Sequence, residues 1–564
     1  MRTAVAVLLA GSIAAGCGNP PPPVEPPSAA PAAGPLTAVV PGAVVLRRGN
    51  GGEPETLDPH RAQSVPAQNI LRDLFEGLTA EAADGSVIPG AAAHWDISRD
   101  GRRYTFYLDP EARWSDGVAL SAEDFVYSLR RSADPVTGSP AVQVLSPIVN
   151  AAAVFAGRLP PEALGVRALN RRAVQIDLEH PTPYFLGLLA LPPAYPLRRA
   201  SVEAAPDTFT RPGMLIGNGP YLLAEWRVGS RIRLLRNPHY RDQDRLAIDE
   251  VQYYPIADPN VELARYRAGD IDWTYDLPNA RLDWLRQQFP AALTVAPWLG
   301  TYYLGFNLTR PPFAEAPALR RALNLAIDRD LLVDKVTRFG ELPSFNLTPP
   351  GMSGYRQPQP VEAGWTQNER ETEARRLYQE AGYSTTQPLR LELRYNTSAN
   401  HKKIALAVAA MWRAVLGVET SLLNEEWKVF LQNRQQKRVT EAFRGGWIGD
   451  YNDPYAFLEI FHSAHRQNDT GYADPSYDRL LERIAAEPVP VRRFRLLAEA
   501  ERRLLAAQPV APLYTYVTKR LVNPRVKGWQ HNLMDHHPSR FMYFTTGAED
   551  TPVPPPAAHS GTGR

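Results

Sequence analysis

Low-complexity sequence is confined to the two ends of this chain of 564 residues. Residues 18–35 are rich in proline and alanine and include four consecutive prolines, which favour an extended segment without a core. Residues 548–564 are again rich in Pro, Gly, Ala and Ser, and we expect them to be disordered. No second linker, heptad run or fixed-period repeat lies between these ends. The sequence therefore predicts one large folded unit between them.

The composition excludes several classes of protein. The 62 basic and 60 acidic side chains nearly cancel, which argues against a general electrostatic grip on nucleic acid. Apolar residues make up 44% of the chain, enough for a folded core. The 54 prolines disfavour long helical bundles, because proline breaks helix interiors.

Short apolar alternations separated by turn residues predict strands with one buried face, and helical patterns stand between them. The predicted strands are 103–108, 173–178, 231–235 and 389–394. A capping-box-like start at Ser121 predicts a helix, and another is predicted over 368–381, ending at Gly382. The predicted class is mixed α/β.

The chain has one cysteine, Cys17, so an intramolecular disulfide and a cysteine-rich zinc site are excluded. The apolar run 4–15 is too short to span a bilayer and ends in small residues directly before Cys17, as in a secretory signal. This junction resembles a bacterial lipobox. We expect a signal peptide over 1–16, a lipid on Cys17 and a tether over 17–43; an ordinary signal with an incidental cysteine is the alternative.

Searches for catalytic motifs find no G-x-S-x-G elbow, H-E-x-x-H helix or phosphate-binding glycine loop. His462 with His465 and His536 with His537 could each ligate a metal, but no acidic or cysteine partner stands at a helpful spacing. We expect neither an enzyme nor a cofactor or metal.

A series of motifs, in one order along the chain, carries a family resemblance. The segments are GGEPETLDPH at 51–60, RDLFEGL at 72–78, WSDG at 114–117, AEDFVYS at 122–128, NGPY at 218–221, EARRLYQEAGY at 373–383, YNTS at 395–398, HKK at 401–403 and GWIGDYNDP at 446–454. From about residue 44 to 544 the chain resembles the extracytoplasmic oligopeptide-binding proteins of bacterial ABC importers, solute-binding protein family 5.

The resemblance implies a periplasmic-binding-protein-like α/β fold in which two lobes close over a ligand and a third lobe is inserted. By this resemblance, lobe I comprises 44–75, 200–300 and 516–547, the inserted lobe II is 76–199, and lobe III is 301–515.

The resemblance also implies how a short peptide is held. Asp450 matches the carboxylate that pairs with the peptide's α-ammonium, although an aspartate in Asp-Tyr-Asn-Asp-Pro can also stabilise a turn through its side chain. Arg444 and His401 match positions that meet the carboxylate end, and arginine suits a carboxylate because its donors form a planar fork. The backbone around Val65, Gly446 and Ile448 matches segments that pair with the peptide backbone.

Aromatic residues in the matching segments are candidates for the cavity wall, although core packing is their commoner fate. They are Trp427, Trp447, Tyr302, Tyr303 and Tyr514. Some positions depart from well-known relatives: Thr337 replaces a lysine, Ala141 a tyrosine and Gln63 a glutamate, while Gly300 and Ile448 stand at cysteine positions of some relatives. We therefore expect dipeptides to bind poorly.

The expected function is capture of short oligopeptides in an inter-lobe cleft and delivery to an ABC permease. We expect a monomer in the periplasm or at the cell surface, held to a bacterial membrane through Cys17, without nucleic acid. Murein peptides or another small solute, an extracytoplasmic peptidase, and a chaperone or sensor role remain the alternatives.

Overall fold

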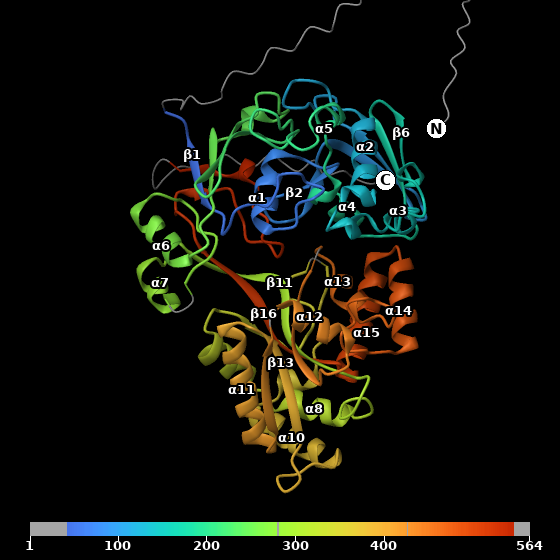
Figure 1. Cartoon of the computed structure of the whole chain (residues 1–564), viewed down its shortest axis with the longest axis vertical. Helices are drawn as coiled ribbons and strands as arrows, with labels where there is room; N and C mark the ends of the chain where they lie inside the picture. The colour runs from blue at the N-terminus through green and yellow to red at the C-terminus, as the bar shows by residue number, and fades with distance from the viewer. Residues whose placement is uncertain (1–41, 279–280, 353, 426, 450, 546–564) are drawn as a thin grey trace, which may run out of the picture. The chain divides into compact units, whose positions relative to one another are not determined.

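The computed structural model describes residues 42–545, except residues 279–280, 353, 426 and 450. Within this described part, three sheets have four or more strands, and helices are interleaved with them along the chain (Figure 1). The mixed α/β class predicted from the sequence is confirmed.

The first sheet has the order β1-β10-β9-β8, with β1 parallel to β10 and the other neighbours antiparallel. Its strands are β1 (Val45–Gly49), β8 (Tyr221–Arg227), β9 (Arg231–Arg236) and β10 (Glu250–Tyr254). Helix α1 (Val65–Leu74) begins after Ser64, whose hydroxyl accepts a hydrogen bond from the backbone N–H of Ala67. Ile70 and Leu71 of α1 are buried in one apolar cluster with Ile232 of the sheet, as expected of an amphipathic helix.

The second sheet, formed within residues 92–177, is antiparallel throughout, with the order β4-β5-β7-β6. Its strands are β4 (Ala92–Ile97), β5 (Arg103–Leu108), β6 (Val166–Asn170) and β7 (Ala173–Asp177). Helix α2 (Ala122–Ala133) starts at the predicted capping box, in which Asp124 accepts from the Ser121 N–H at 2.8 Å.

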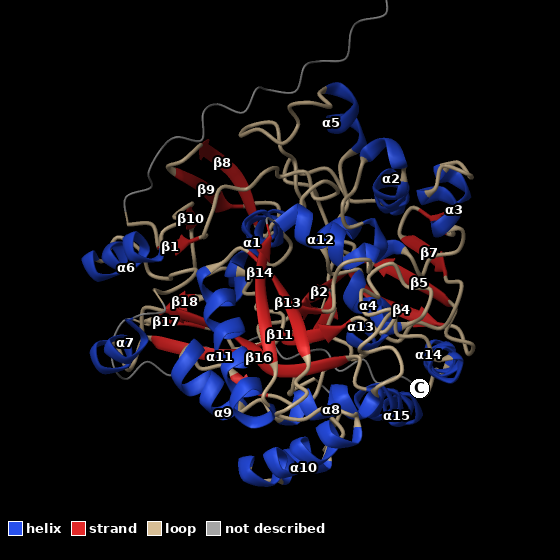
Figure 2. Ribbon diagram, turned by 60° about the horizontal axis from the view of Figure 1, so that its bottom comes forward, coloured by secondary structure: helices blue, strands red, loops and turns tan. Residues whose placement is uncertain are grey.

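The third sheet has the order β12-β16-β11-β15-β13-β14 and is mixed, because only β13 runs parallel to its neighbours β14 and β15. Its strands are β11 (Leu293–Phe306), β12 (Leu342–Pro343), β13 (Arg390–Asn396), β14 (Glu419–Glu425), β15 (Ala442–Ile448) and β16 (Val510–Leu521). Figure 2 shows α11 (Ala399–Leu416) beside this sheet, where it contacts β13 and β14. The predicted second helix is α10 (Gln367–Glu380), which packs on α8 (Pro317–Leu325).

The two longest strands, β11 and β16, are paired in two stretches with a break between them. Residues 293–297 of β11 pair with 517–521 of β16, and the register shifts before pairing resumes at Thr301 and Thr515. Trp298, Leu299 and Gly300 have no partner in the β16 ladder. This interruption lies next to the candidate site described below.

The remaining elements are short helices and hairpins, apart from a longer pair, α14 and α15, that pack on each other. They are α3 (Ala151–Phe155), α4 (Phe185–Leu188), α5 (Arg199–Ala204), α6 (Pro259–Ala268), α7 (Leu282–Gln288), α9 (Arg329–Leu331), α12 (Trp427–Gln436), α13 (Tyr455–Leu458), α14 (Pro475–Ala486), α15 (Pro490–Ala507), β2 (Thr79–Glu81), β3 (Val87–Pro89), β17 (Val526–Lys527) and β18 (Tyr543–Phe544). No helix in the described part of the chain is both long enough and apolar enough to cross a bilayer. The predicted lobe boundaries stay a prediction.

Candidate functional site

Strand β15 has one partly unoccupied edge. On one side it pairs with β11 along its whole length, from Ala442 opposite Phe306 to Ile448 opposite Gly300. On the other side its described ladder with β13 covers only Ala442 and Phe443. Residues 444–448 therefore face no described strand on that edge, and their backbone donors and acceptors there are free to pair with an extended peptide.

Arg444 and Gly446 share one face of β15, because side chains alternate along a strand. The Arg444 Nη2 donates a hydrogen bond to the Tyr516 hydroxyl at 3.0 Å, and the guanidinium lies 5.0 Å from the Tyr302 ring centroid. Tyr302 in turn stacks on Tyr514 with 4.9 Å between ring centroids. A side chain at Gly446 would meet the Tyr516 hydroxyl at 2.7 Å, so glycine keeps this face open.

His401 joins this cluster from the first turn of α11, where the Ser398 side chain accepts from the His401 N–H. Its Nδ1 lies 3.4 Å from the Tyr302 hydroxyl. Burial, with a smaller contribution from the Arg444 charge, lowers the pKa of His401 to about 4. His401 is therefore neutral at neutral pH and leaves Arg444 as the charged group of the cluster.

Arg444 has unused hydrogen-bonding capacity. No described carboxylate forms an ion pair with it, and its buried Nε has no hydrogen-bond partner among the described residues. Burial opposes its charge, but the hydroxyls of Tyr516, Tyr302 and Tyr514 outweigh burial, and the net shift of the Arg444 pKa is upward. A charged guanidinium that meets no described acid is a suitable partner for a carboxylate.

Arg329, a fully buried arginine, shows how the fold can use the donors of a guanidinium without an acid. Arg329 also lacks an acidic partner at ion-pair distance within the described residues, yet its Nε and both terminal nitrogens donate to acceptors of four residues, which are Asn324, Ile327, Ser344 and Pro512. Arg329 is satisfied by the fold, whereas Arg444 is not.

Tyr303 and Trp447 lie on the opposite face of the same strands. Tyr303 is 7% exposed and packs in the apolar cluster that contains Phe461, with 6.5 Å between ring centroids. Trp447 packs against the same cluster, and its buried Nε1 has no partner among the described residues. The structure thus brings Arg444, His401 and Tyr514 together and places Tyr303 and Trp447 elsewhere. Tyr516 was missed, although it follows Tyr514 at the two-residue period of a strand.

A cavity of about 430 Å³ lies beside this cluster and contains two other predicted residues. Val65, the first residue of α1, and Ile448, the last residue of β15, both line it and are 41% and 44% exposed. Trp298 also lines the cavity, and its ring is 6.3 Å from that of Tyr516. Trp298 therefore connects the cavity with the Arg444 cluster. Ala141 lines the same cavity.

One wall of the cavity is charged. Lys519 Nζ lies 3.5 Å from Asp276 Oδ1, and Arg520 donates to both oxygens of Asp535. His536, also in this wall, has its Nδ1 2.8 Å from a carboxylate oxygen of Glu81. The charges of both signs in the wall are paired, and the wall has no large excess of either sign.

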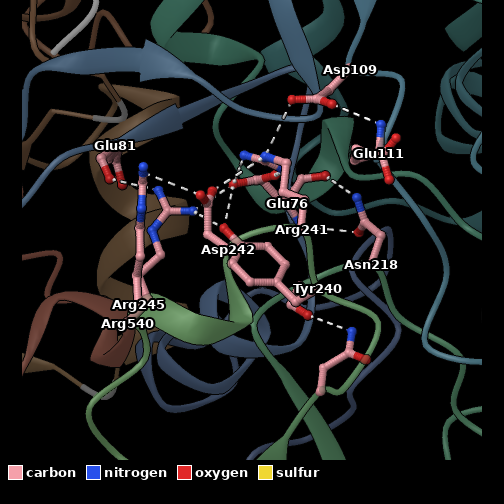
Figure 3. A network of polar contacts seen from close by, with 12 residues as sticks. Glu76, Glu81, Asp109, Glu111, Asn218, Tyr240, Arg241, Asp242, Arg245 and Arg540 are labelled. Atoms are coloured by element: carbon pink, nitrogen blue, oxygen red, sulfur yellow. Dashed lines mark hydrogen bonds and ion pairs between the residues drawn. The ribbon is translucent and has the colours of Figure 1, made fainter. Parts of the chain in front are cut away.

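A network of polar contacts around the buried Glu76, drawn in Figure 3, lies next to this wall. Glu76 accepts hydrogen bonds from Arg241, Arg540 and the Tyr240 hydroxyl, and Asn218 bonds to its backbone at both ends. Burial raises the pKa of Glu76, and the two arginines outweigh it, so the net shift is downward. Through Glu76 and Arg540, this network connects the segment just before β2 with the segment just before β18.

Three predicted residues lie outside what the structure describes. Cys17 and Asp450 fall on residues that are not described, and of Trp427 only the backbone, as the first residue of α12, is described. On either side of position 450, the Gly449 N–H donates to the Leu299 carbonyl at 2.8 Å, and the ring of Tyr451 stacks on that of Tyr184 at 4.2 Å. Thr337 is buried, and its hydroxyl donates a hydrogen bond to Glu341 at 2.8 Å.

Three features fit a receptor for a small extended solute: the sheets, a strand edge that faces no described strand, and an arginine that meets no described acid beside a cavity. The family model of bacterial extracellular solute-binding proteins, family 5, matches residues 86–469. The chain belongs to this family, as its motifs predict. The comparisons also confirm the predicted periplasmic-binding-protein-like fold.

Several characterised proteins are similar over nearly the whole chain. The periplasmic oligopeptide-binding protein OppA of Escherichia coli is 39% identical over 519 residues, covering 90% of this chain and 95% of that protein. The periplasmic murein peptide-binding protein MppA of the same species is 39% identical over 496 residues, covering 87% and 91%.

Solved structures of the same family are similar to this chain over most of its length. The unliganded open form of the murein tripeptide-binding protein MppA matches with a TM-score of 0.82 at 38% identity, covering 89% of this chain and 98% of that one. OppA of Haemophilus influenzae in complex with the peptide RPPGFSPFR matches with a TM-score of 0.73 at 34% identity, covering 89% and 99%.

Proposed function

We propose that this protein captures short oligopeptides outside the cytoplasm and delivers them to an ABC transporter permease. The observation that carries the proposal is Arg444, a guanidinium without an acidic partner in the described structure, beside the open edge of β15. A peptide offers what both features lack, namely a carboxylate and a row of backbone donors and acceptors. The relatives named above include proteins that bind oligopeptides and murein peptides.

In the proposed binding mode the peptide is held by its ends and backbone. Asp450 pairs with the α-ammonium, because an enclosed ammonium costs several kcal/mol of desolvation unless it is paired. The edge of residues 444–448 and the segment at Val65 pair with the backbone, and Arg444 with His401 meets the carboxylate. Ligand that contacts more than one lobe stabilises the closed form through its higher affinity for that form.

The amino-end contact is tested by comparing a free tripeptide with its N-acetylated form by isothermal titration calorimetry. We expect the wild type to bind only the free peptide and Asp450→Ala to lose that binding. Asp244→Ala, at an exposed position, is the matched control and binds as the wild type does. Equal binding of both peptides by the wild type contradicts the proposal.

Murein peptides are the second candidate ligand, because MppA gives a TM-score of 0.82. Competition of a murein tripeptide against a tripeptide of ordinary L-residues in the same calorimeter distinguishes the two. A murein tripeptide that binds more tightly by tenfold or more, ~1.4 kcal/mol, makes murein peptides the preferred ligand class.

We also propose that the protein acts as a monomer without catalytic activity and is anchored through a lipid on Cys17. Mass spectrometry of membrane-extracted protein is expected to find acylated Cys17 at the mature N-terminus. Peptides incubated overnight with the protein are expected to be recovered intact. An unmodified Cys17 contradicts the anchor, and cleaved peptides contradict the absence of catalysis.

A further inference from the structure

Glu262, on α6, is a buried acid that the binding mode above does not use. Glu262 is 1% exposed, and each of its two carboxylate oxygens accepts a hydrogen bond from one backbone N–H. Oε1 accepts from Tyr275 at 2.8 Å, and Oε2 accepts from Asp276 at 3.1 Å. Within the described residues, no cation forms an ion pair with this carboxylate. Its interactions are therefore directed at one short piece of backbone.

That piece of backbone forms part of the cavity wall. Tyr275 and Asp276 both line the cavity that Val65 and Ile448 enter, and Asp276 makes the ion pair with Lys519. Gly49 packs against the Glu262 carboxylate so closely that a Cβ there would lie 1.7 Å from Oε1. The backbone of Gly49 therefore closes one side of the carboxylate.

A second buried acid shows how the fold treats a purely structural carboxylate. Glu501, in α15, is fully buried without a described cation, but it accepts from four donor groups. They are the backbone N–H groups of Leu347 and Thr348 and the hydroxyls of Thr348 and Tyr355. Within the described part of the chain Glu262 accepts from two donors, both in the cavity wall, so a change in its ionisation acts directly on that wall.

The surroundings of Glu262 place its titration close to neutrality. Burial raises its pKa, the two N–H groups lower it, Asp276 raises it, and Arg520 of β16 lowers it weakly; the net value is about 7. The facing groups are Tyr275 and Asp276 from the segment before α7, and Arg520. A carboxylate accepts both N–H groups well, whereas a protonated acid keeps one good acceptor oxygen and gains a hydroxyl without a described acceptor.

We propose that Glu262 is a positioning residue for ligand binding, whose carboxylate holds Tyr275 and Asp276 in the cavity wall and releases them on protonation. The inference rests on the proposed function in one respect, that the peptide occupies this cavity. Affinity for peptide therefore falls as Glu262 becomes protonated.

The test is the affinity for trialanine measured by calorimetry between pH 5.5 and 8.0 for wild type and Glu262→Gln. The titration of trialanine is the same for both proteins and cancels in the ratio of their affinities. We expect this ratio, wild type over variant, to rise by roughly threefold to tenfold across the range, as expected for a partly lost charge-assisted hydrogen bond. Glu501→Gln, the matched buried-acid control, is expected to give a ratio that does not change with pH. A constant ratio for Glu262→Gln overturns the proposal.

A measurement without ligand keeps the inference separate from the proposed function. Hydrogen exchange of the wild-type segment 271–277, corrected for intrinsic exchange, is expected to show lower protection below pH 7 than above it. Protection that does not change with pH overturns the role of Glu262. This test uses the wild type alone, so it still decides if Glu262→Gln fails to fold. Lack of trialanine binding by the wild type at every pH counts against the proposed function, while the exchange result still decides on Glu262.

Discussion

Two regions of this protein that contain partly or fully buried arginine side chains treat those charges in opposite ways. Around Glu76, the guanidinium groups of Arg241 and Arg540 converge on one carboxylate, and each charge has a partner (Figure 3). Around Arg444, three tyrosines and a neutral histidine surround a guanidinium that meets no described acid. The charges around Glu76 are paired with opposite charges, whereas Arg444 meets no opposite charge among the described residues.

The comparison separates charges that stabilise the fold from a charge that is available to bind a ligand. A buried charge that is fully paired holds segments of the fold together, and removing its partner leaves an uncompensated charge. A charge that the fold leaves without an acid adds little to stability, but it gives a ligand carboxylate a partner that has lost part of its hydration already. Mutations in the two regions should therefore affect different measurements.

Glu76→Gln should have the largest effect on stability. The substitution keeps the shape of the side chain and removes the negative charge that Arg241 and Arg540 share, so the free energy of unfolding should fall by about 3–5 kcal/mol. Urea unfolding followed by circular dichroism measures it. The control is Glu111→Gln, whose exposed carboxylate lies 3.7 Å from Arg113 and should contribute less than about 0.5 kcal/mol. Equal losses for both variants would remove the contrast between the paired network and the surface.

Arg444→Met should give the reverse pattern. Methionine retains the apolar contact with the Tyr302 ring, so the free energy of unfolding should change by less than about 1 kcal/mol. Peptide affinity should fall by about ten- to a hundredfold, because a hydrogen-bonded charge contributes roughly 1.5–3 kcal/mol. Calorimetry with a free tripeptide measures the affinity. A loss of stability as large as that of Glu76→Gln would make Arg444 a structural residue instead.

The sequence predicts the fold and part of the site, because motifs and strand alternation are local. It cannot tell which of the consecutive residues Tyr302 and Tyr303 faces Arg444, since a strand sends them to opposite faces and both are equally aromatic. The contacts of Glu76 with Arg241 and Arg540 join residues 165 and 464 positions apart, and no pattern in the chain announces them. That Arg444 meets no acid among the described residues becomes evident only when its neighbours have been located in space.

Tyr516→Phe tests the orientation of Arg444 with a smaller change. It removes the hydroxyl that accepts from Nη2 and leaves the ring in place, so one further donor of Arg444 is left without a partner. We expect a loss of about 0.5–1.5 kcal/mol in peptide affinity, roughly threefold to tenfold. Tyr303→Phe, on the opposite face, is the control and should leave the affinity unchanged. Equal losses from both variants would show that the face of the strand does not matter.

The last test concerns the ionisation of His401, which acts only at acidic pH. Its pKa is lowered from 6.5 to about 4, so the unfolded chain takes up this proton first as the pH falls. The stability that His401 contributes is complete above pH 6.5 and is lost as the pH falls from there towards 4. Wild type should therefore lose stability relative to His401→Gln between pH 7 and 4, which unfolding at a series of pH values measures.

The pKa of His401 also reports on the ligand. A bound peptide carboxylate at Arg444 offsets the positive charge that opposes protonation of His401, so NMR titration should find a higher pKa for His401 with tripeptide than without it. An unchanged pKa of His401 would show that the peptide carboxylate binds away from Arg444. Arg444 would then have no ligand partner, and the contrast with the paired charges around Glu76 would no longer mark a binding site.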